Sequence, residues 1–191
     1  DSLFQKELFE RVQAMLEAGE PLRGVEWKAA EQDALKPLCL LSSKKILYVA
    51  NVSDDDLEGQ GPHAQKVAAR AAETGSEWIA ICTDLESELR NMEGEDREMF
   101  MEELGVKELG LGRLIRATYK LLGLQTFYTA GPKEIRAWTI HAGWTGPKAA
   151  GVIHTDFEKG FIRAECYQVE DLVEHGSEAA IKAAGLSLIH I

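Results

Sequence analysis

The sequence predicts an α/β segment followed by a smaller α+β module. Two apolar, β-rich runs, residues 46–50 and 78–82, flank an alanine-rich helical pattern over residues 63–75. A strand, a helix and a second strand within about forty residues form the minimal unit of a parallel sheet with a crossover helix. From residue 126 onwards the pattern changes to short strands around one or two small helices, which is typical of α+β folds.

The negative charge of the chain excludes binding to nucleic acid by charge alone. The net charge is −11; residues 1–125 carry 15 Lys and Arg against 24 Asp and Glu, and residues 126–191 carry 6 against 8. The C-terminal part is therefore the better candidate for contact with RNA or a ribosome. No window reaches the length of a membrane span, and the charged, amphipathic N-terminus does not resemble a signal peptide. We expect a cytoplasmic monomer that does not bind membranes.

The cysteines and histidines show no pattern of a disulfide or a metal site. Cys39, Cys82 and Cys166 are far apart, odd in number and set in apolar runs, so they are expected to be reduced, buried thiols. The five histidines lack ligand spacing. We predict no metal site built from protein side chains.

The first 39 residues predict two helices. Apolar residues recur at helical spacing over residues 1–18, and Gly19 and Pro21 end that helix. A second helix is expected over residues 25–35, with Trp27 directed towards the core, before Pro37 interrupts it.

The strand over residues 46–50 ends on Asn51-Val52-Ser53-Asp54, the first candidate for a ligand site. In open α/β sheets, ligands bind just beyond the carboxyl ends of the strands. Asn offers a donor and an acceptor, whereas a carboxylate only accepts, so Asn51 and Asp54 could contact the edge of a purine base. Taken alone, the same residues are more typical of a turn that merely ends the strand.

Three further helices are expected before residue 123. The acidic stretch that begins at Thr83 predicts a helix N-terminus, and residues 96–104 predict a helix that ends at Gly105. Residues 111–122 form a strongly amphipathic pattern with Gly123 as its C-cap. The basic residues of this last helix share one side, which we interpret as a solvated face; they are Arg113, Arg116 and Lys120.

The C-terminal part predicts strands over residues 126–129 and 135–140, with a Gly-rich connection over 143–151. Residues 152–157 and 161–166 are expected to form further short strands, and residues 179–184 a helix. His154 and Asp156 have no nucleophile or paired base beside them in the sequence. We therefore assign both a structural role and predict no catalytic residue.

Four stretches give the sequence a resemblance to a known family: LYVANV (47–52), LGLGRLIRATYKLLGLQTFYTAG (109–131), KEIRAWTI (133–140) and AAGVIHTDFEKGFIRAE (149–165). Over residues 1–185 the chain resembles the C-terminal part of an Obg-like ATPase of the YchF type, a relative of the P-loop GTPases. The last stretch resembles the TGS domain, a ubiquitin-like β-grasp module. The resemblance implies three parts: a returning arm of a helical insertion with a linker helix (1–39), the C-terminal half of a P-loop nucleotide-binding domain (40–125), and a TGS domain, truncated at its end (126–191).

The resemblance implies roles for residues at the ends of the two strands. P-loop GTPases contact guanine with Asn-Lys-x-Asp, and Obg-like ATPases carry Asn-x-x-Glu in its place. Here Asn51, Val52 and Asp54 stand at these positions, and Ile81, Cys82 and Thr83 occupy the last nucleotide motif. ATP is therefore the implied ligand, and GTP stays open because Asp54 restores the shorter, guanine-type carboxylate. Cys82 itself is expected to pack inside the protein rather than to react.

The phosphate-binding motif G-x-x-x-x-G-K-[ST] does not occur in the sequence. Hydrolysis depends on the phosphate loop and Mg²⁺ more than on base contacts, so we expect these residues alone to be inactive and Mg²⁺ to bind only in a full-length protein. Residues 186–191 depart from the TGS pattern, which predicts a sheet that lacks its final strands and exposes an edge. Both ends indicate a fragment.

Two functions from different classes follow. The first is an ATP-hydrolysing translation factor that binds the ribosome, on its large subunit or ribosomal RNA. The alternative is a non-catalytic TGS module that binds the ribosome or RNA and uses the α/β part as a scaffold. The basic residues that could contact RNA phosphates, and that fit ordinary surface charge equally well, are Lys133, Arg136, Lys148, Lys159 and Arg163.

Overall fold

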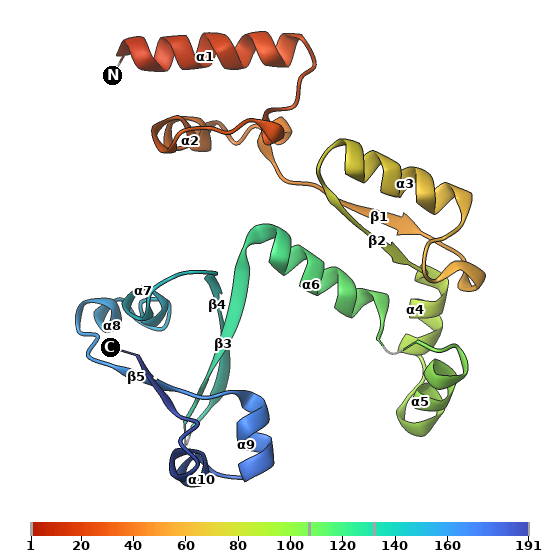
Figure 1. The fold of residues 1–191 in the computed structure, drawn as a ribbon, viewed down its shortest axis with the longest axis vertical. Helices are drawn as coiled ribbons and strands as arrows, with labels where there is room; N and C mark the ends of the chain where they lie inside the picture. Colours follow the sequence, from red (N-terminus) through yellow and green to blue (C-terminus); the bar gives the residue numbers. More distant parts are fainter. Residues whose placement is uncertain (1, 107, 132, 191) are drawn as a thin grey trace. The chain divides into compact units, whose positions relative to one another are not determined.

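The computed structural model describes residues 2–106, 108–131 and 133–190, and the chain forms two compact units, Asp1–Leu122 and Gly123–Ile191 (Figure 1). The first residue of the predicted segment 1–39 and the last residue of the predicted tail 186–191 lie outside the described residues.

The first unit begins with helices and continues into the predicted strand, helix and strand. Its helices and strands are α1 (Ser2–Glu17), α2 (Ala29–Leu35), β1 (Leu47–Asn51), α3 (Pro62–Glu73), β2 (Glu77–Ile81), α4 (Thr83–Arg90), α5 (Gly94–Glu103) and α6 (Gly110–Leu122). Short 3₁₀ turns η1 (Leu22–Gly24), η2 (Lys36–Leu38), η3 (Leu41–Ser43) and η4 (Asp54–Asp56) link some of these elements. Pro62 stands at the start of α3, where a missing N–H costs no hydrogen bond.

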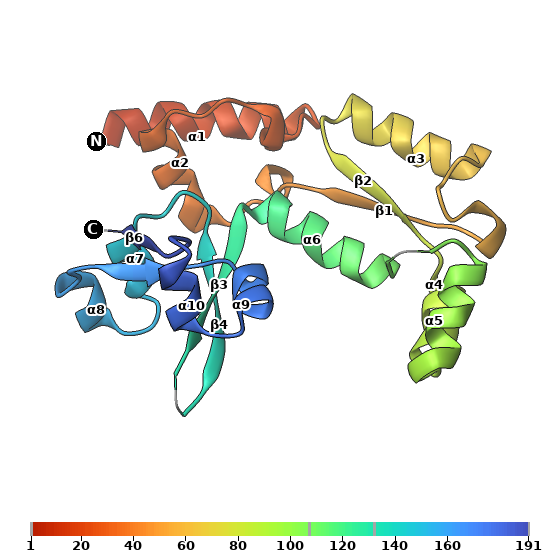
Figure 2. The same cartoon turned by 60° about the horizontal axis from the view of Figure 1, so that its bottom comes forward.

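Strands β1 and β2 pair in parallel, in a register that places Leu47 opposite Glu77 and Asn51 opposite Ile81. Helix α3, which connects the two strands, packs against both of them, and α6 packs chiefly against β2. In both ribbon views α3 and α6 lie on opposite sides of the strand pair (Figures 1 and 2). The parallel strand–helix–strand prediction is confirmed, and both strands end at the same edge of the sheet.

The core of the N-terminal helices is formed by Leu8, Val12, Leu22 and Leu35, with Trp27 packed against it. The Trp27 indole N–H donates to the Leu22 carbonyl oxygen over 3.1 Å, so this side chain anchors the core as predicted. The second helix is shorter than the predicted 25–35. It begins at Ala29 because the Glu31 carboxylate accepts the Lys28 backbone N–H at 2.8 Å and caps the helix there.

A second core cluster lies behind the ends of β1 and β2. Cys82, Leu85 and Leu89 are buried in it, and Val52 packs against them. Leu89 has no solvent exposure at all. This cluster fixes the beginning of α4 beneath the loop that follows β1.

The C-terminal unit contains two antiparallel strand pairs and four short helices in its described residues. Its elements are β3 (Leu124–Ala130), β4 (Ile135–His141), α7 (Gly146–Ala150), α8 (Thr155–Lys159), β5 (Ala164–Cys166), α9 (Val169–His175), α10 (Glu178–Ala183) and β6 (Leu188–His190). Strand β3 pairs with β4, and β5 pairs with β6. The Lys182 ammonium on α10 lies 2.5 Å from the Glu165 carboxylate on β5 and lowers the pKa of that carboxyl.

The structure corrects several predictions for the C-terminal part. Residues 152–157 form a turn and the start of α8 instead of a strand, because the His154 ring nitrogen accepts the Asp156 N–H and caps that helix. Helix α9 was not predicted. The tail, which we expected to leave the sheet edge exposed, instead supplies β6 and pairs with β5. Cys39 and Cys166 are exposed and only Cys82 is buried, so burial was predicted wrongly for two thiols.

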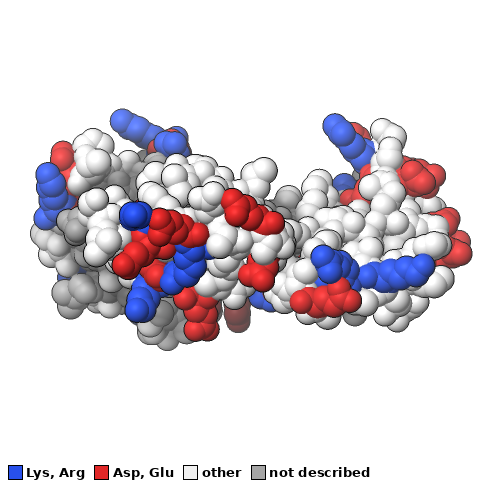
Figure 3. All heavy atoms as spheres, turned by 90° about the horizontal axis from the view of Figure 1, so that it is seen from above, with Lys and Arg blue, Asp and Glu red and all other residues white. Residues whose placement is uncertain are grey.

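Charged side chains of both signs are interspersed on the displayed face of the molecule (Figure 3). In the part of the chain that the structure describes, no helix is long and apolar enough to cross a membrane.

Candidate functional site

The candidate site lies at the common edge where β1 and β2 end. The register pairs Asn51 with Ile81, and the Val52 N–H donates to the Ile81 carbonyl oxygen at 3.0 Å, which extends the ladder by one bond. The segments predicted to contact a nucleotide base, residues 51–54 and 81–83, are thereby brought side by side. This is the edge at which open α/β sheets bind ligands.

Asn51 and Thr83 join these two segments directly. The side-chain oxygen of Asn51 accepts the Thr83 backbone N–H at 3.2 Å and the Thr83 hydroxyl at 3.0 Å. Both residues are exposed. Because the Asn51 oxygen is already used by these two hydrogen bonds within the protein, the amide NH₂ group of Asn51 supplies the donors for a ligand.

The three apolar members of the predicted set face inwards. Ile81 and Cys82 are 6% and 5% exposed, and Val52 is half-buried against the cluster of Cys82, Leu85 and Leu89. Their side chains therefore set the position of the two loops. The burial of Cys82 agrees with a packing role.

The loop after β1 is held by a carboxylate that the sequence reasoning did not single out. The Asp56 side chain accepts the backbone N–H groups of Gln60 and Gly61 at 2.6 and 2.9 Å. Ser53 donates its hydroxyl to Asp55, and Asp54 opens the 3₁₀ turn η4. The signal was present, since Asp commonly bonds backbone N–H groups a few residues ahead in turns. Thus Asp54 is exposed at the site, whereas Asp55 and Asp56 stabilise the loop.

A cavity of about 270 Å³ opens beside Asp54 and has an apolar floor and an acidic rim. Its lining residues are Ser53, Asp54, Cys82, Asp84, Leu85, Glu88, Phe100 and Leu104. Apolar side chains suit the faces of a flat ring, and carboxylates accept from ring amines. The same carboxylates would repel a phosphate group, so the cavity fits a base better than a phosphate. Among the described residues, no group of three or more His, Cys, Asp and Glu could hold a metal ion.

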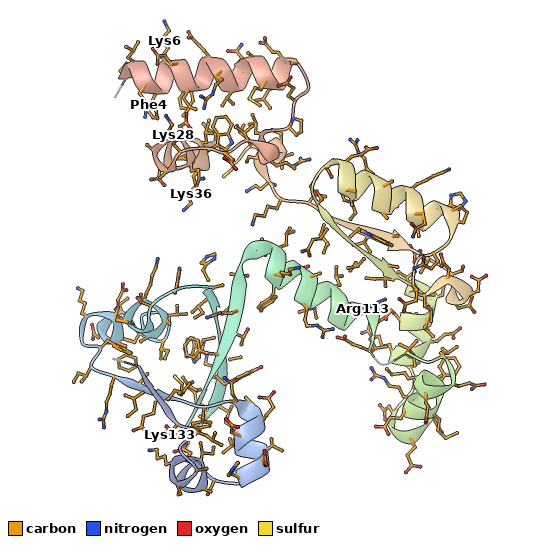
Figure 4. All side chains as sticks on the ribbon, viewed as in Figure 1. Phe4, Lys6, Lys28, Lys36, Arg113 and Lys133 are labelled. Carbon is orange, nitrogen blue, oxygen red and sulfur yellow. The ribbon has the colours of Figure 1, made fainter. Side chains whose placement is uncertain are left out.

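The five basic residues that were predicted to contact RNA lie on several elements of the C-terminal unit. Lys133 lies in the turn between β3 and β4 (Figure 4), and Arg136 follows it on β4 with its guanidinium 4.2 Å from the centre of the Trp138 ring. Lys148 on α7 places its ammonium 4.4 Å from the centre of the Trp144 ring.

Lys159 ends α8, which packs on α7, and Arg163 directly precedes β5. Strand β4 separates the turn that holds Lys133 from the connection to α7, and a rise of about 3.3 Å per residue makes that strand about 20 Å long. That these five residues contact RNA stays a prediction.

Comparisons with known proteins agree with this architecture. A family model named YchF-GTPase_C, described as "Protein of unknown function (DUF933)", matches residues 124–190. The chain is 46% identical over 187 residues to the "Ribosome-binding ATPase YchF" of Bacillus subtilis, covering 97% of this chain and 51% of that protein. It is 40% identical over 163 residues to "Obg-like ATPase 1" of Gallus gallus, covering 84% of this chain and 41% of that protein.

A solved structure from Schizosaccharomyces pombe, titled "Structure of the Schizosaccharomyces pombe YchF GTPase", matches with a TM-score of 0.79 and 32% identity. The match covers 96% of this chain and 50% of that chain. The chain thus spans about half the length of the curated relatives that it matches first.

Proposed function

Since this chain belongs to the family of YchF and Obg-like ATPases, we propose that it supplies the base-recognition part of a nucleotide-hydrolysing protein that binds the ribosome. The observation that carries the proposal is the Asn51 side-chain oxygen that accepts both the N–H and the hydroxyl of Thr83 at the common edge of β1 and β2. This bond pair gives the two loops a defined spacing beside the cavity.

The base would lie in the cavity at Asp54, with its ring against the apolar floor. Asn51 would donate its amide hydrogens to a ring nitrogen, and Asp54 would accept from an exocyclic amine. Val52, Ile81 and Cys82 would contribute backbone groups, and Thr83 would keep Asn51 in place.

ATP is the proposed ligand, with GTP as the alternative. The relatives from Bacillus subtilis and Escherichia coli are named ATPases, whereas the Schizosaccharomyces pombe structure is titled a GTPase. Guanine presents two adjacent donors to a single carboxylate and adenine presents one amine, so Asp54 permits either base.

The phosphate groups and Mg²⁺ would be bound by the half of the family's fold to which this sequence does not align. The sequence contains no phosphate loop, and the rim of the cavity is acidic. Residues 51–54 and 81–83 would therefore select the nucleotide without hydrolysing it, because hydrolysis requires the phosphate loop and the metal.

The C-terminal unit favours a second activity, contact with ribosomal RNA or ribosomal protein in the cytoplasm. We propose that it has the β-grasp arrangement of a TGS domain. The antiparallel β3–β4 pair supports this assignment. The cations that lie over Trp138 and Trp144 support RNA as the partner, because aromatic rings and cations together bind bases and phosphates.

Calorimetry tests the proposal with ATP and GTP, each with and without Mg²⁺, on this chain and on the protein as its gene encodes it. We expect no tight binding to this chain and Mg²⁺-dependent binding of ATP to the encoded protein. Micromolar, Mg²⁺-dependent binding to this chain would mean that its own residues bind the phosphates, and the assignment to base recognition alone would be wrong.

A further inference from the structure

We propose that the N-terminal end of α6 positions the base-contacting residues 81–83, and that Glu86 and Arg113 are the positioning residues. The inference rests on the proposed base recognition and extends it to side chains that lie outside the base-contacting segments. Three separate contacts carry it: one before the segment, one against its first residue and one after its last residue.

The first contact ties the residues after the segment to α6. Glu86 lies on α4, one turn beyond Thr83, and its two carboxylate oxygens face the first residues of α6. One oxygen accepts the Gly110 N–H at 2.5 Å and the other the Leu111 N–H at 3.3 Å. The first N–H groups of a helix have no partner inside the helix, and a carboxylate is stabilised there by the helix dipole. Glu86 therefore fixes the start of α4 against α6.

The second contact ties the residue before the segment to the same helix. Arg113 lies on α6 (Figure 4). Its guanidinium donates from Nη2 to the Ala80 carbonyl oxygen at 2.7 Å, and Ala80 directly precedes Ile81. The Arg113 Nε is buried without a hydrogen-bond partner. The Arg113 side chain thus reaches from α6 to the backbone of β2, although burying an unpaired donor costs free energy. We had interpreted Arg113 as part of a solvated face, and this contact corrects that interpretation.

The third contact is the close approach of Gly110 to Ile81. A Cβ atom at position 110 would lie 2.9 Å from Ile81 Cγ2 and 3.0 Å from Glu86 Oε1. Only glycine allows the first turn of α6 to approach Ile81 this closely.

Together the three contacts bracket residues 81–83 at Ala80, Ile81 and Glu86. Thr83, at the end of the segment, donates both of its hydrogen bonds to Asn51. A displacement of α6 would therefore move Thr83 relative to Asn51 and change the spacing of the two base-contacting loops. Losing Glu86 or Arg113 should weaken base binding and selectivity, while the turnover of bound nucleotide stays the same.

The test uses the protein as its gene encodes it, with Glu86→Gln and Arg113→Met as variants. Lys120→Gln is the matched control, because Lys120 lies on the same helix and pairs with Glu77 at the opposite end of β2, 2.6 Å away. Affinities for ATP and GTP are measured by calorimetry, KM and kcat by steady-state hydrolysis, and the exposure of the Cys82 and Thr83 amides by hydrogen exchange.

We expect about a tenfold loss of ATP affinity in Glu86→Gln, the size of one charge-assisted hydrogen bond. The ratio of ATP to GTP affinity should change, KM should rise at constant kcat, and exchange at Cys82 and Thr83 should accelerate. Arg113→Lys keeps a donor and should restore part of the affinity lost in Arg113→Met. The Lys120→Gln control should behave as the parent protein.

Unchanged exchange and affinity in both Glu86→Gln and Arg113→Met would overturn the inference. If the parent protein binds neither ATP nor GTP, the proposed function is wrong. Exchange at Cys82 and Thr83 then still decides whether α6 positions the segment, so the two failures are distinguishable.

Discussion

The side-chain oxygen of Asn51 accepts two hydrogen bonds from Thr83, which lies 32 positions further along the sequence. The Thr83 N–H donates to it at 3.2 Å and the Thr83 hydroxyl at 3.0 Å. A single acceptor thereby joins the loops that follow two neighbouring strands.

We predict that Asn51→Ala lowers nucleotide affinity at least about tenfold, because it removes a ligand donor and leaves two protein donors without their partner. Calorimetry with ATP on the protein as its gene encodes it measures the loss. Asn91→Ala is the control, since Asn91 only donates to Ser87 on α4, and equal affinities of the two variants would contradict the prediction.

Asp54 is expected to set the preference between adenine and guanine. Replacing it by the longer carboxylate of the family pattern, Asp54→Glu, should shift the affinity ratio several-fold towards ATP. Asp55→Glu changes the adjacent side chain, which accepts from Ser53, and should leave the ratio unaltered. Competition between ATP and GTP measures the ratio, and a shift of equal size in both variants would argue that Asp54 does not contact the base.

Leu89 is completely buried behind the candidate site, whereas Leu41 is 83% exposed. Leu89→Ala should reduce the free energy of unfolding by about 2–5 kcal/mol, because it removes buried methyl groups and leaves a cavity. Leu41→Ala should change it by less than about 0.5 kcal/mol, as is usual for exposed positions. Denaturant titration followed by circular dichroism compares the two, and similar midpoints would contradict the packing of α4 described above.

Acid should destabilise the contact between α1 and α2. Glu31 accepts from the Lys28 N–H and, at 2.6 Å, from the Arg11 guanidinium, and these hydrogen bonds lower the pKa of its carboxyl below the ordinary value of 4.5. A carboxyl with a lowered pKa stabilises the fold above its ordinary pKa and loses that contribution as the pH falls through the folded value.

The parent protein should therefore be more stable than Glu31→Gln at pH 7, and the difference should shrink as the pH falls below 4.5. Thermal melts from pH 7 to pH 3 measure the difference. A gap that stays constant over this range would exclude a role for the charge of Glu31.

The C-terminal unit should contribute basic contacts to ribosome binding. Lys148→Ala should weaken binding and reduce the slope of log K against log salt concentration by about one, as the loss of one phosphate contact does. Lys6→Ala on α1 removes an exposed lysine of the other unit, which pairs with Glu10, and should leave the slope unchanged. Sedimentation with ribosomes at several salt concentrations provides the slopes. An unchanged slope in Lys148→Ala would mean that this lysine does not contact phosphate.

Local patterns were sufficient for the α/β part of the chain. Apolar runs around an alanine-rich helix predicted β1, α3 and β2, and the amphipathic pattern before Gly123 predicted α6. The spacing of apolar residues indicates which face of a helix or strand is buried, and a short window of sequence is enough to recognise it. In the C-terminal part the strand predicted over residues 152–157 was wrong, because His154 caps a helix there. The partner of the tail could not be predicted either, since strand pairing depends on residues that are distant in the sequence.

By itself, the sequence determined the order of elements, the resemblance to a family and the identity of the residues at the strand ends, because these follow from local propensity and motif. Only the tertiary structure decided that Asn51 bonds Thr83, that Arg113 reaches under β2 to Ala80, and that Glu86 caps α6. Those contacts join residues 24 to 33 positions apart. They depend on how the helices pack against the strands, and a local sequence pattern does not predict which distant residues come into contact.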